Sequence, residues 1–396
     1  MAYGWPTDAQ FLVPPEVPKH FQATLGDRGG KARKAWEAMF AKYEKEYPKE
    51  ASELKLMQAR ELPTGWQSAI PTFETDAKGM ATRISGGKVL NAFAKKIPWL
   101  LGGSADLAPS TKTLLTFEEA GGGFSAENPG GRNFHFGIRE HGMAAAVNGM
   151  ALCGLRPYGA TFFVFTDYMR PSMRLSAIMN LPTLMVLTHD SIGVGEDGPT
   201  HQPIEHLAAC RAIPNLIVFR PGDANEVAVA YQVALAQAHR PVAMVLTRQD
   251  LPTLDRTKYA PAAGVAKGGY VLACAAPDGK PDVILLATGS ELQVAVTAHE
   301  KLVADGIRSR VVSLPSFELF NEQPVEYQNK VLPPQSTKRV AIEAGIRQCW
   351  DQYLGATGVF IGLDDYGASA PYQEIFKHRG ITAEAAVAKA RELCSR

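Results

Sequence analysis

Residues 183–203 read TLMVLTHDSIGVGEDGPTHQP, and this stretch is the most informative part of the chain. An uninterrupted apolar run, residues 184–187, is followed at once by two histidines, three carboxylates and three glycines. A short apolar run without alternation is typical of a strand buried in a parallel sheet that is covered on both faces. Because ligands bind beyond the carboxyl ends of such strands, we expect the polar residues to form a functional site.

The polar stretch contains Gly-x-Gly-x-x-Gly at Gly193, Gly195 and Gly198, a pattern that also occurs in dinucleotide-binding proteins. In those proteins the glycines open a helix, whereas here Pro199 and Pro203 follow directly. We therefore exclude a dinucleotide-binding helix at this position.

Strands and helices alternate on both sides of this stretch, over residues 66–260. The alternation predicts an α/β domain with a mainly parallel sheet flanked by helices. Residues 261–396 repeat the pattern on a smaller scale and predict a second α/β domain. The expected strands are 99–102, 158–165, 183–188, 216–220, 242–247, 283–287, 310–314 and 339–342, and the expected helices are 83–96, 140–152, 168–179, 224–238, 291–305 and 383–393.

Residues 1–65 differ from the two expected domains. Apolar and charged residues alternate at helical spacing over residues 30–60, and Pro48 divides this run into two helices. The few apolar positions cannot enclose a core, so we expect a helical arm.

Composition excludes several classes of protein. A net charge of +1 leaves no basic surface for a nucleic-acid backbone, and no apolar run approaches the length that a membrane span requires. The five cysteines are scattered without a Cys-x-x-Cys pair, which argues against a zinc site and against a disulfide framework. No secretory signal is visible at the N-terminus, and we expect a cytoplasmic protein with no metal ligands in this chain.

Three further groups of residues are candidates for a site. Glu140 lies at an expected helix start between Arg139 and His141, and it acts either on the helix dipole or as a tuned acid or base. The block at residues 102–110 is either a ligand loop, in which two glycines let the backbone approach, or a simple turn. Arg83 and Arg248 could clamp a phosphate monoester.

An aromatic set follows the strand expected to begin at Tyr158. Core packing is the default for Phe162, Phe165 and Tyr168, and a flat heteroaromatic ligand could use one of these rings. Phe162 and Phe165 are three residues apart, so a regular strand would send them to opposite faces.

Together these blocks resemble transketolase, a family of thiamine-diphosphate enzymes. The resemblance covers nearly the whole chain, and the block at residues 189–203 is its most specific part. It implies transfer of a two-carbon ketol unit from a ketose phosphate to an aldose phosphate, within a homodimer whose active sites lie between subunits. The residues that it implies are Glu140, Phe162, Phe165 and Tyr168 for the cofactor's pyrimidine, Asp106 and Leu107 near its thiazolium, Arg83, Ser110, His189 and Arg248 for the sugar phosphate, Asp197 for an acceptor hydroxyl, and His201 near the reacting centre.

The resemblance also shows a departure. The family binds the diphosphate and Mg²⁺ or Ca²⁺ through a Gly-Asp-Gly motif in an N-terminal domain, and this sequence contains no Gly-Asp-Gly. We therefore expect that this domain is missing, that the chain is a fragment or one subunit of a split enzyme with a possible separate N-terminal partner, and that it is inactive alone.

Several alternatives remain open. Dihydroxyacetone synthase, 1-deoxyxylulose-5-phosphate synthase and the β subunit of 2-oxo-acid dehydrogenases share this cofactor. His189, His201, Arg83 and Arg248 favour ketose-phosphate chemistry over 2-oxo-acid decarboxylation. A non-catalytic dimerisation or regulatory module is the alternative from another class.

Overall fold

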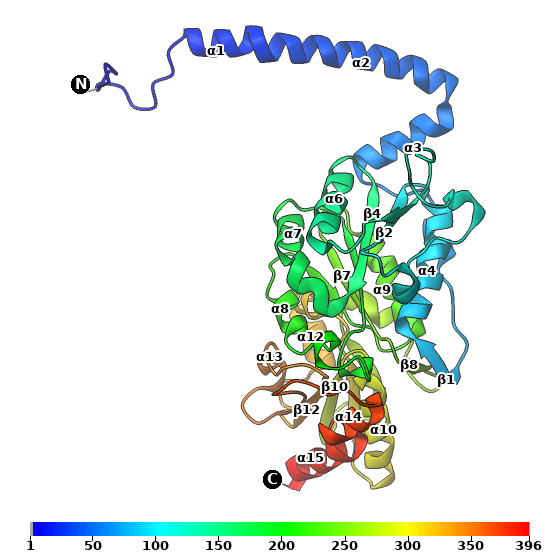
Figure 1. The fold of residues 1–396 in the computed structure, drawn as a ribbon. Helices are drawn as coiled ribbons and strands as arrows, with labels where there is room; N and C mark the ends of the chain where they lie inside the picture. Colours follow the sequence, from blue (N-terminus) through cyan, green and yellow to red (C-terminus); the bar gives the residue numbers. More distant parts are fainter. Residues whose placement is uncertain (1–2, 396) are drawn as a thin grey trace. The chain divides into compact units, whose positions relative to one another are not determined.

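The computed structural model describes residues 3–395, and the chain divides between Ala59 and Arg60 into two units. The first unit is helical, with α1 (Glu16–Phe21), a π-helical turn (Gln22–Gly26), α2 (Asp27–Glu46) and α3 (Pro48–Ala59), drawn in blue in Figure 1. Pro48 lacks an amide hydrogen and is best accommodated in the first turn of a helix, so α2 ends before it and α3 begins with it. The two helices expected on either side of Pro48 are confirmed, whereas the domain boundaries at 65 and 260 stay predictions.

The second unit contains a sheet of six strands in the order β3-β2-β4-β5-β7-β6. All neighbouring strands are parallel, as the buried apolar runs predict. The strands are β2 (Leu100–Ser104), β3 (Asn133–His135), β4 (Arg156–Phe162), β5 (Leu184–Thr188), β6 (Ile217–Phe219) and β7 (Val242–Leu246). β3 is an edge strand that the sequence analysis did not detect.

Helices cover both faces of this sheet. Figure 1 shows α6 and α7 on one side and α4 and α9 on the other, and the helices of each pair contact one another. α9 begins after Asp223, whose carboxylate accepts a hydrogen bond from the amide of Glu226 (2.8 Å). The helices are α4 (Thr82–Lys96), α6 (Glu140–Leu152), α7 (Thr166–Ile178), α8 (His206–Arg211) and α9 (Ala224–Ala236).

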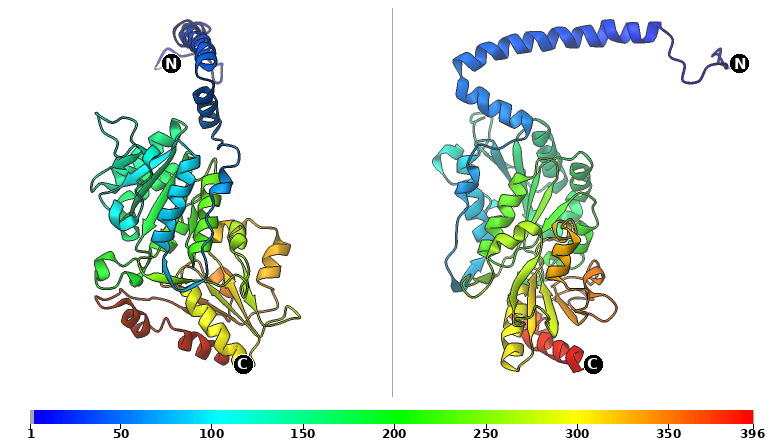
Figure 2. Two further views of the ribbon diagram at one scale, coloured as in Figure 1. Left: turned by 90° about the vertical axis from the view of Figure 1, so that its right-hand side faces the viewer. Right: turned by 180° about the vertical axis from the view of Figure 1, so that it is seen from behind.

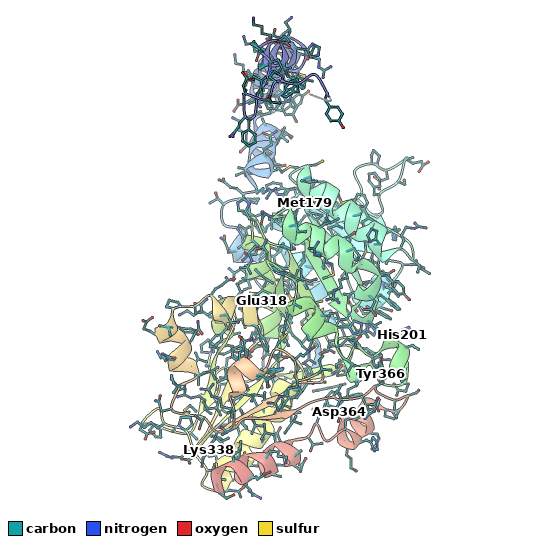
Figure 3. The ribbon with its side chains drawn as sticks, turned by 90° about the vertical axis from the view of Figure 1, so that its left-hand side faces the viewer. Met179, His201, Glu318, Lys338, Asp364 and Tyr366 are labelled. Carbon is teal, nitrogen blue, oxygen red and sulfur yellow. The ribbon has the colours of Figure 1, made fainter. Side chains whose placement is uncertain are left out.

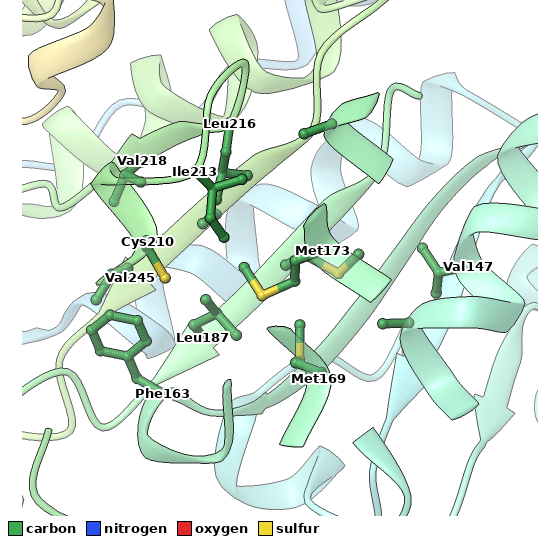
Figure 4. Packing of buried hydrophobic residues seen from close by; sticks show 14 of the residues in the cluster. Val147, Phe163, Met169, Met173, Leu187, Cys210, Ile213, Leu216, Val218 and Val245 are labelled. Carbon is green, nitrogen blue, oxygen red and sulfur yellow. The ribbon is translucent and has the colours of Figure 1, made fainter. Parts of the chain in front are cut away.

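One hydrophobic cluster of this domain lies between the sheet and α6, α7 and α8. Met169 and Met173 of α7 pack in the same buried cluster as Leu187 of β5 and Val245 of β7 (Figure 4). These side chains stand on the face of the strands opposite to α4 and α9. The cluster anchors the strand ends from which the polar loops emerge.

A smaller sheet of five strands follows, in the order β13-β12-β10-β11-β9, with only β9 antiparallel. Figure 2 shows this C-terminal part of the chain, coloured from yellow to red, in two further views. Its strands are β9 (Tyr270–Cys274), β10 (Val283–Ala287), β11 (Ser309–Ser313), β12 (Arg339–Ile342) and β13 (Val359–Ile361). Its helices are α10 (Glu291–Ala304), α11 (Phe317–Asn321), α12 (Val325–Val331), α13 (Asp351–Leu354), α14 (Tyr372–His378) and α15 (Ala383–Ser395). The second α/β domain is therefore confirmed, and β9, β13 and α11–α14 are additions to the sequence prediction.

A separate antiparallel pair links two distant parts of the chain. β1 (Asp76–Ala81) pairs with β8 (Asp250–Thr253), so Ala81 lies opposite Asp250. The amide of Ala81 also donates to the Asp250 carboxylate (2.8 Å). This pair brings the start of α4 next to the end of β7, and no local pattern in the sequence predicts that proximity.

The two sheets meet around one buried arginine. Arg220 follows β6 and is 1% exposed, and its guanidinium binds Asp190, which follows β5, at 2.7 and 3.0 Å. The same guanidinium pairs with Glu291 at the start of α10 and donates to the carbonyl of Thr288 (3.2 Å). Burial opposes the charge, but Glu291, Asp190 and Glu343 together raise the pKa of Arg220 above its ordinary value.

A second ion pair extends this network. Arg211 at the end of α8 donates two parallel hydrogen bonds to Glu343 after β12, both at 2.8 Å. Trp350 donates its indole N–H to the same carboxylate (2.8 Å). Burial would raise the pKa of Glu343, but Arg211 and Arg220 outweigh it and lower this pKa to about 2.

The described residues contain neither a membrane-spanning helix nor a disulfide bond. Among residues 3–395, no helix combines the length and the apolar character that crossing a membrane requires. All five cysteines are free thiols.

We predict that Arg220→Met destabilises the chain by about 3–5 kcal/mol, because Asp190 and Glu291 lose the counter-charge of a fully buried pair. The measurement is the midpoint of urea unfolding. The matched control is Arg240→Met, which breaks a half-exposed pair with Glu322 and should cost about 0–1 kcal/mol. Equal losses in the two variants would show that the buried network contributes no more than a surface pair.

Candidate active site

The loop that follows β5 folds into two single turns of 3₁₀-helix, Ile192–Val194 and Pro199–His201. The hydroxyl of Ser191 accepts a hydrogen bond from the amide of Gly193 (3.2 Å) and so caps the first turn. Gly195 and Gly198 adopt positive φ angles of 82° and 79°, which a residue with a β-carbon adopts rarely. No long helix begins at these glycines, as expected from the prolines that follow them.

A buried carboxylate lies one strand away. Glu140, the first residue of α6, is 6% exposed and accepts a hydrogen bond from the Thr161 hydroxyl of β4 (3.0 Å). It lines a pocket of about 470 Å³. The other residues of this pocket are Ile138, Arg139, His141, Phe165 and Tyr168. A single oriented carboxyl group in a partly apolar pocket suits a flat ligand with one polar ring atom.

The aromatic residues gather beside this pocket in a way that the strand periodicity did not predict. β4 ends at Phe162, and residues 163–165 form a 3₁₀ turn that reverses the expected alternation. As a result the rings of Phe162 and Phe165 lie 5.9 Å apart and nearly parallel, at 10°. The expectation that they point to opposite faces is therefore wrong, because it assumed that the strand continues through Phe165.

Both predicted histidines join this aromatic group. The ring centroid of His189 lies 3.7 Å from that of Phe162, and the ring of His201 lies 5.6 Å from that of Phe165. His189 is 3% exposed and has a φ of 62°, an unfavourable angle for a residue with a side chain. The hydroxyl of Thr188 holds its Nδ1 at 2.8 Å. Strained and buried residues of this kind are frequent at functional sites.

Two arginines lie close enough to His189 to act on its pKa. The side-chain hydroxyl of Thr82 and the amide of Thr247 are bonded (2.7 Å), which fixes Arg83 and Arg248 at adjoining element ends. Burial, followed by the charges of Arg83, Arg248 and His201, lowers the pKa of His189 to about 3. The imidazole is therefore neutral at physiological pH.

The arginines themselves form a concentrated positive region. Burial and the charge of Arg248 both lower the pKa of Arg83, against an opposing effect of Asp250. Arg83 donates to the carbonyl of Ser110 (2.7 Å), which lies in the short helix α5 (Ala108–Thr111). The four residues expected to bind a phosphate, Arg83, Ser110, His189 and Arg248, thus come together.

The block at residues 102–110 has a different structure from the one expected. Gly102 and Gly103 lie inside β2, and a β-carbon at Gly103 would come within 1.7 Å of the carbonyl oxygen of Phe134. These glycines allow close packing of neighbouring strands, so the expectation that they let the backbone approach a ligand is wrong. Asp106, exposed with a φ of 65°, and Leu107 follow the strand end, while Asp197 is exposed on the loop after β5.

Two glutamines of the site were missed by the sequence analysis. Gln249 follows Arg248 and is 5% exposed, yet neither atom of its amide group has a hydrogen-bond partner among the described residues. Gln202 is 2% exposed and its Oε1 also lacks one in that part of the chain. The available signal was that each glutamine directly follows a candidate site residue, Arg248 or His201. A glutamine carries no charge, so the sequence alone does not distinguish it from a surface residue.

Comparison with protein families places three models on the chain. Residues 78–253 match the transketolase pyrimidine binding domain, residues 268–382 match the transketolase-like C-terminal domain, and residues 1–63 match the transketolase thiamine diphosphate binding domain. The last match does not support the expectation that the N-terminal domain is missing.

Individual relatives agree with these models. A transketolase of Geobacillus stearothermophilus is 50% identical over 99% of this chain, which spans 58% of that relative's length. A chloroplastic transketolase of Craterostigma plantagineum is 52% identical over 98% of this chain and 74% of the relative.

Solved structures give the same result for the fold. Transketolase from Leishmania mexicana superposes with a TM-score of 0.89 at 38% identity, over 100% of this chain and 57% of that one. A structure described as a split gene transketolase, inactive β4 tetramer, superposes with a TM-score of 0.65 at 27% identity, over 80% of this chain and 99% of that one.

We predict that the free energy of unfolding of His189→Gln depends less on pH than that of the wild type. The unfolded imidazole binds a proton below about pH 6.5, whereas the folded one does so only below about pH 3. The wild type therefore loses up to about 1.4 kcal/mol per pH unit as the pH falls through this window, and His189→Gln does not. Urea unfolding at several pH values measures both slopes, and identical slopes would mean that folded His189 takes up protons normally.

Proposed function

The chain belongs to the transketolase family, and from this premise we propose that it carries the pyrimidine-binding half of a transketolase active site. The proposed reaction moves a two-carbon ketol unit from a ketose phosphate, such as xylulose 5-phosphate, to an aldose phosphate, such as ribose 5-phosphate. One observation carries the proposal. A buried carboxylate, a stacked aromatic pair and two arginines gather near the carboxyl ends of neighbouring strands. The relatives reported above are all named transketolase, so dihydroxyacetone synthase, the other thiamine enzymes and a non-catalytic module are not favoured.

Thiamine diphosphate with a divalent metal is the cofactor of this family. The donor set fits its pyrimidine: Glu140 offers one buried carboxyl group, and Phe165 and Tyr168 line the same pocket. When bound, the cofactor supplies an electron sink for breaking a carbon–carbon bond next to a carbonyl. Proton sharing with the cofactor, orientation of its ring and binding of the substrate phosphate are proposed for the side chains of this chain.

We propose that Glu140 shares a proton with a ring nitrogen of the pyrimidine. The Thr161 hydroxyl donates to Oε1 of Glu140 and so orients the carboxyl group. The other carboxyl oxygen does not take part in that bond and can face the ring nitrogen. Phe162 and Phe165 exclude water and orient the ring, with Tyr168 at the rim. Asp106 and Leu107, at the end of β2, are proposed to contact the cofactor near its thiazolium.

We propose that the substrate phosphate binds between Arg83 and Arg248. Guanidinium groups pair with phosphate oxygens in a bidentate manner, and two of them here stand close enough to depress a pKa. His189 is neutral, so it contributes hydrogen bonds and no charge. Asp197 is proposed to bind an acceptor hydroxyl, and His201, beside Phe165, to lie near the reacting carbon.

We infer that the diphosphate and its metal are bound by residues outside these 396 positions. The supporting observations are the absence of a Gly-Asp-Gly motif and the greater length of the relatives. Ile138 and Tyr168 at the pocket rim are 80% and 66% exposed, as expected if a second copy or another polypeptide covers them. We further propose a reducing compartment such as the cytoplasm, since all five cysteines are free.

The deciding experiment mixes the purified chain with a separately produced diphosphate-binding domain of a transketolase, thiamine diphosphate and Mg²⁺. We expect ketol transfer only in the complete mixture. Glu140→Gln should lower the rate by about 10²–10⁴-fold, because an amide cannot share the proton. Glu322→Gln, a change at a surface pair, is the matched control.

Two outcomes would contradict the proposal. No transfer in the complete mixture would count against the function itself. Robust turnover by the chain alone, with no second polypeptide detectable by mass spectrometry, would show that these 396 residues hold a complete site.

We predict that Arg248→Ala, and separately Arg83→Ala, raise the KM for xylulose 5-phosphate about ten- to a hundredfold. Each removes charge-assisted hydrogen bonds worth about 1.5–3 kcal/mol. Hydroxypyruvate has no phosphate, so its KM should change little. Arg391→Ala, at an exposed arginine of α15, is the control for general loss of positive charge. An equal effect on both donors would assign the arginines to the fold or to the cofactor.

A further inference from the structure

The loop between β5 and α8 is attached to a segment of the C-terminal domain, residues 366–372. Gln202 makes the central contact: its Nε2 donates to the carbonyl of Gly195 within the loop and to the carbonyl of Ala368, both at 2.8 Å. Gln202 is 2% exposed, so neither bond competes with water. Figure 3 labels His201, the neighbour of Gln202 in the loop, and Tyr366, the first residue of the C-terminal segment.

Further contacts hold the backbone on both sides of Asp197. The hydroxyl of Ser369 donates to the carbonyl of Glu196 (2.5 Å). A β-carbon on Gly198 would lie 3.4 Å from the β-carbon of Ser369, and one on Gly195 would lie 3.4 Å from the carbonyl of Ala370. Asp197 itself is exposed, so its position depends on its neighbours and not on burial.

The C-terminal segment also limits the conformation of Gln202. A β-carbon on Gly367 would come within 1.7 Å of Gln202 Oε1. Gly367 is not among the residues with positive φ, so its backbone accepts an alanine. The contact therefore exists because residue 367 has no side chain, and it keeps the amide of Gln202 directed at Gly195 and Ala368.

We propose that Gln202 is a positioning residue through which the C-terminal domain holds Asp197 and His201 in place for the aldose acceptor. This inference rests on the proposed function, since it assigns the C-terminal domain a part in acceptor binding by the same site. Gln202 touches no reacting atom. It acts by removing alternative conformations from a loop that has little apolar packing of its own around Asp197.

The first test is hydrogen–deuterium exchange on the whole chain, which requires no activity. Gln202→Leu removes the donor at similar volume, Gly367→Ala displaces the amide, and Ser369→Ala removes only the bond to Glu196. Each should speed amide exchange in peptides covering residues 192–203 by about tenfold or more, with exchange in β4 and β7 unchanged. Ser369→Ala, a loss of one exposed hydroxyl, keeps the test valid if Gln202→Leu folds poorly.

Gln293→Ala is the matched control. Gln293 of α10 also donates from Nε2 to two backbone carbonyls of the first α/β domain, those of Gly222 (3.1 Å) and Pro252 (3.4 Å). It joins the same two domains at another place. Its variant should leave exchange in residues 192–203 at the wild-type rate.

The second test is kinetic and uses the complemented enzyme. Gln202→Leu and Gly367→Ala should raise the KM for ribose 5-phosphate about 5- to 50-fold, while the affinity for thiamine diphosphate and the KM for the donor change by less than about twofold. Gln293→Ala should leave all three unchanged. A general structural defect would instead move all three together.

The two tests separate the possible failures. Wild-type exchange rates in residues 192–203 of the Gln202 and Gly367 variants overturn the proposal whether or not the enzyme is active. An active enzyme with an unchanged acceptor KM in these variants overturns it as well. An inactive wild-type mixture contradicts the proposed function, and the exchange rates then decide alone whether Gln202 positions the loop.

Discussion

The way the two α/β domains meet depends on one guanidinium group that is buried away from solvent. Arg220 lies between Asp190 of the larger domain and Glu291 of the smaller one, and none of the three charges reaches water. A buried charge is tolerated only when counter-charges and hydrogen-bond acceptors surround it, so the strand ends that carry these groups must face each other. Because Asp190 directly follows His189, the same constraint sets where the functional loop begins.

The site next to this network depends on the removal of water. His189 lies against the ring of Phe162, and burial together with the positive charges of Arg83 and Arg248 keeps its imidazole neutral. Burial and the charge of Arg248 both act against the charge of Arg83, and Asp250 offsets only part of this combined effect. The phosphate proposed as a ligand would offset this concentration of positive charge, and the partly apolar pocket that contains Glu140 suits the proposed flat ring.

The smaller domain contributes to the site without supplying a proposed substrate-binding residue. Glu291, at the start of α10, binds Arg220, and Glu343, directly after β12, binds Arg211. Residues 366–372 contact the loop that bears Asp197. Loops have few packing contacts of their own, so their conformation is decided by whatever backbone lies against them. In this chain that backbone comes from a segment more than 160 residues further along the sequence.

The sequence by itself determined the α/β architecture and the two-domain order, because apolar runs and helical spacing are local patterns. It also indicated His189, Asp197 and His201, since polar residues directly after a buried strand stand out, and Glu140, since a carboxylate between a cation and an imidazole at a helix start stands out as well. Only the tertiary structure decided that Phe162 and Phe165 stack, that the β1–β8 pair brings Arg83 to Arg248, and that Gln202 meets Ala368. These features depend on contacts between segments far apart in the chain and on the exclusion of water. Neither long-range contact nor burial of this kind produces a periodic pattern in the sequence.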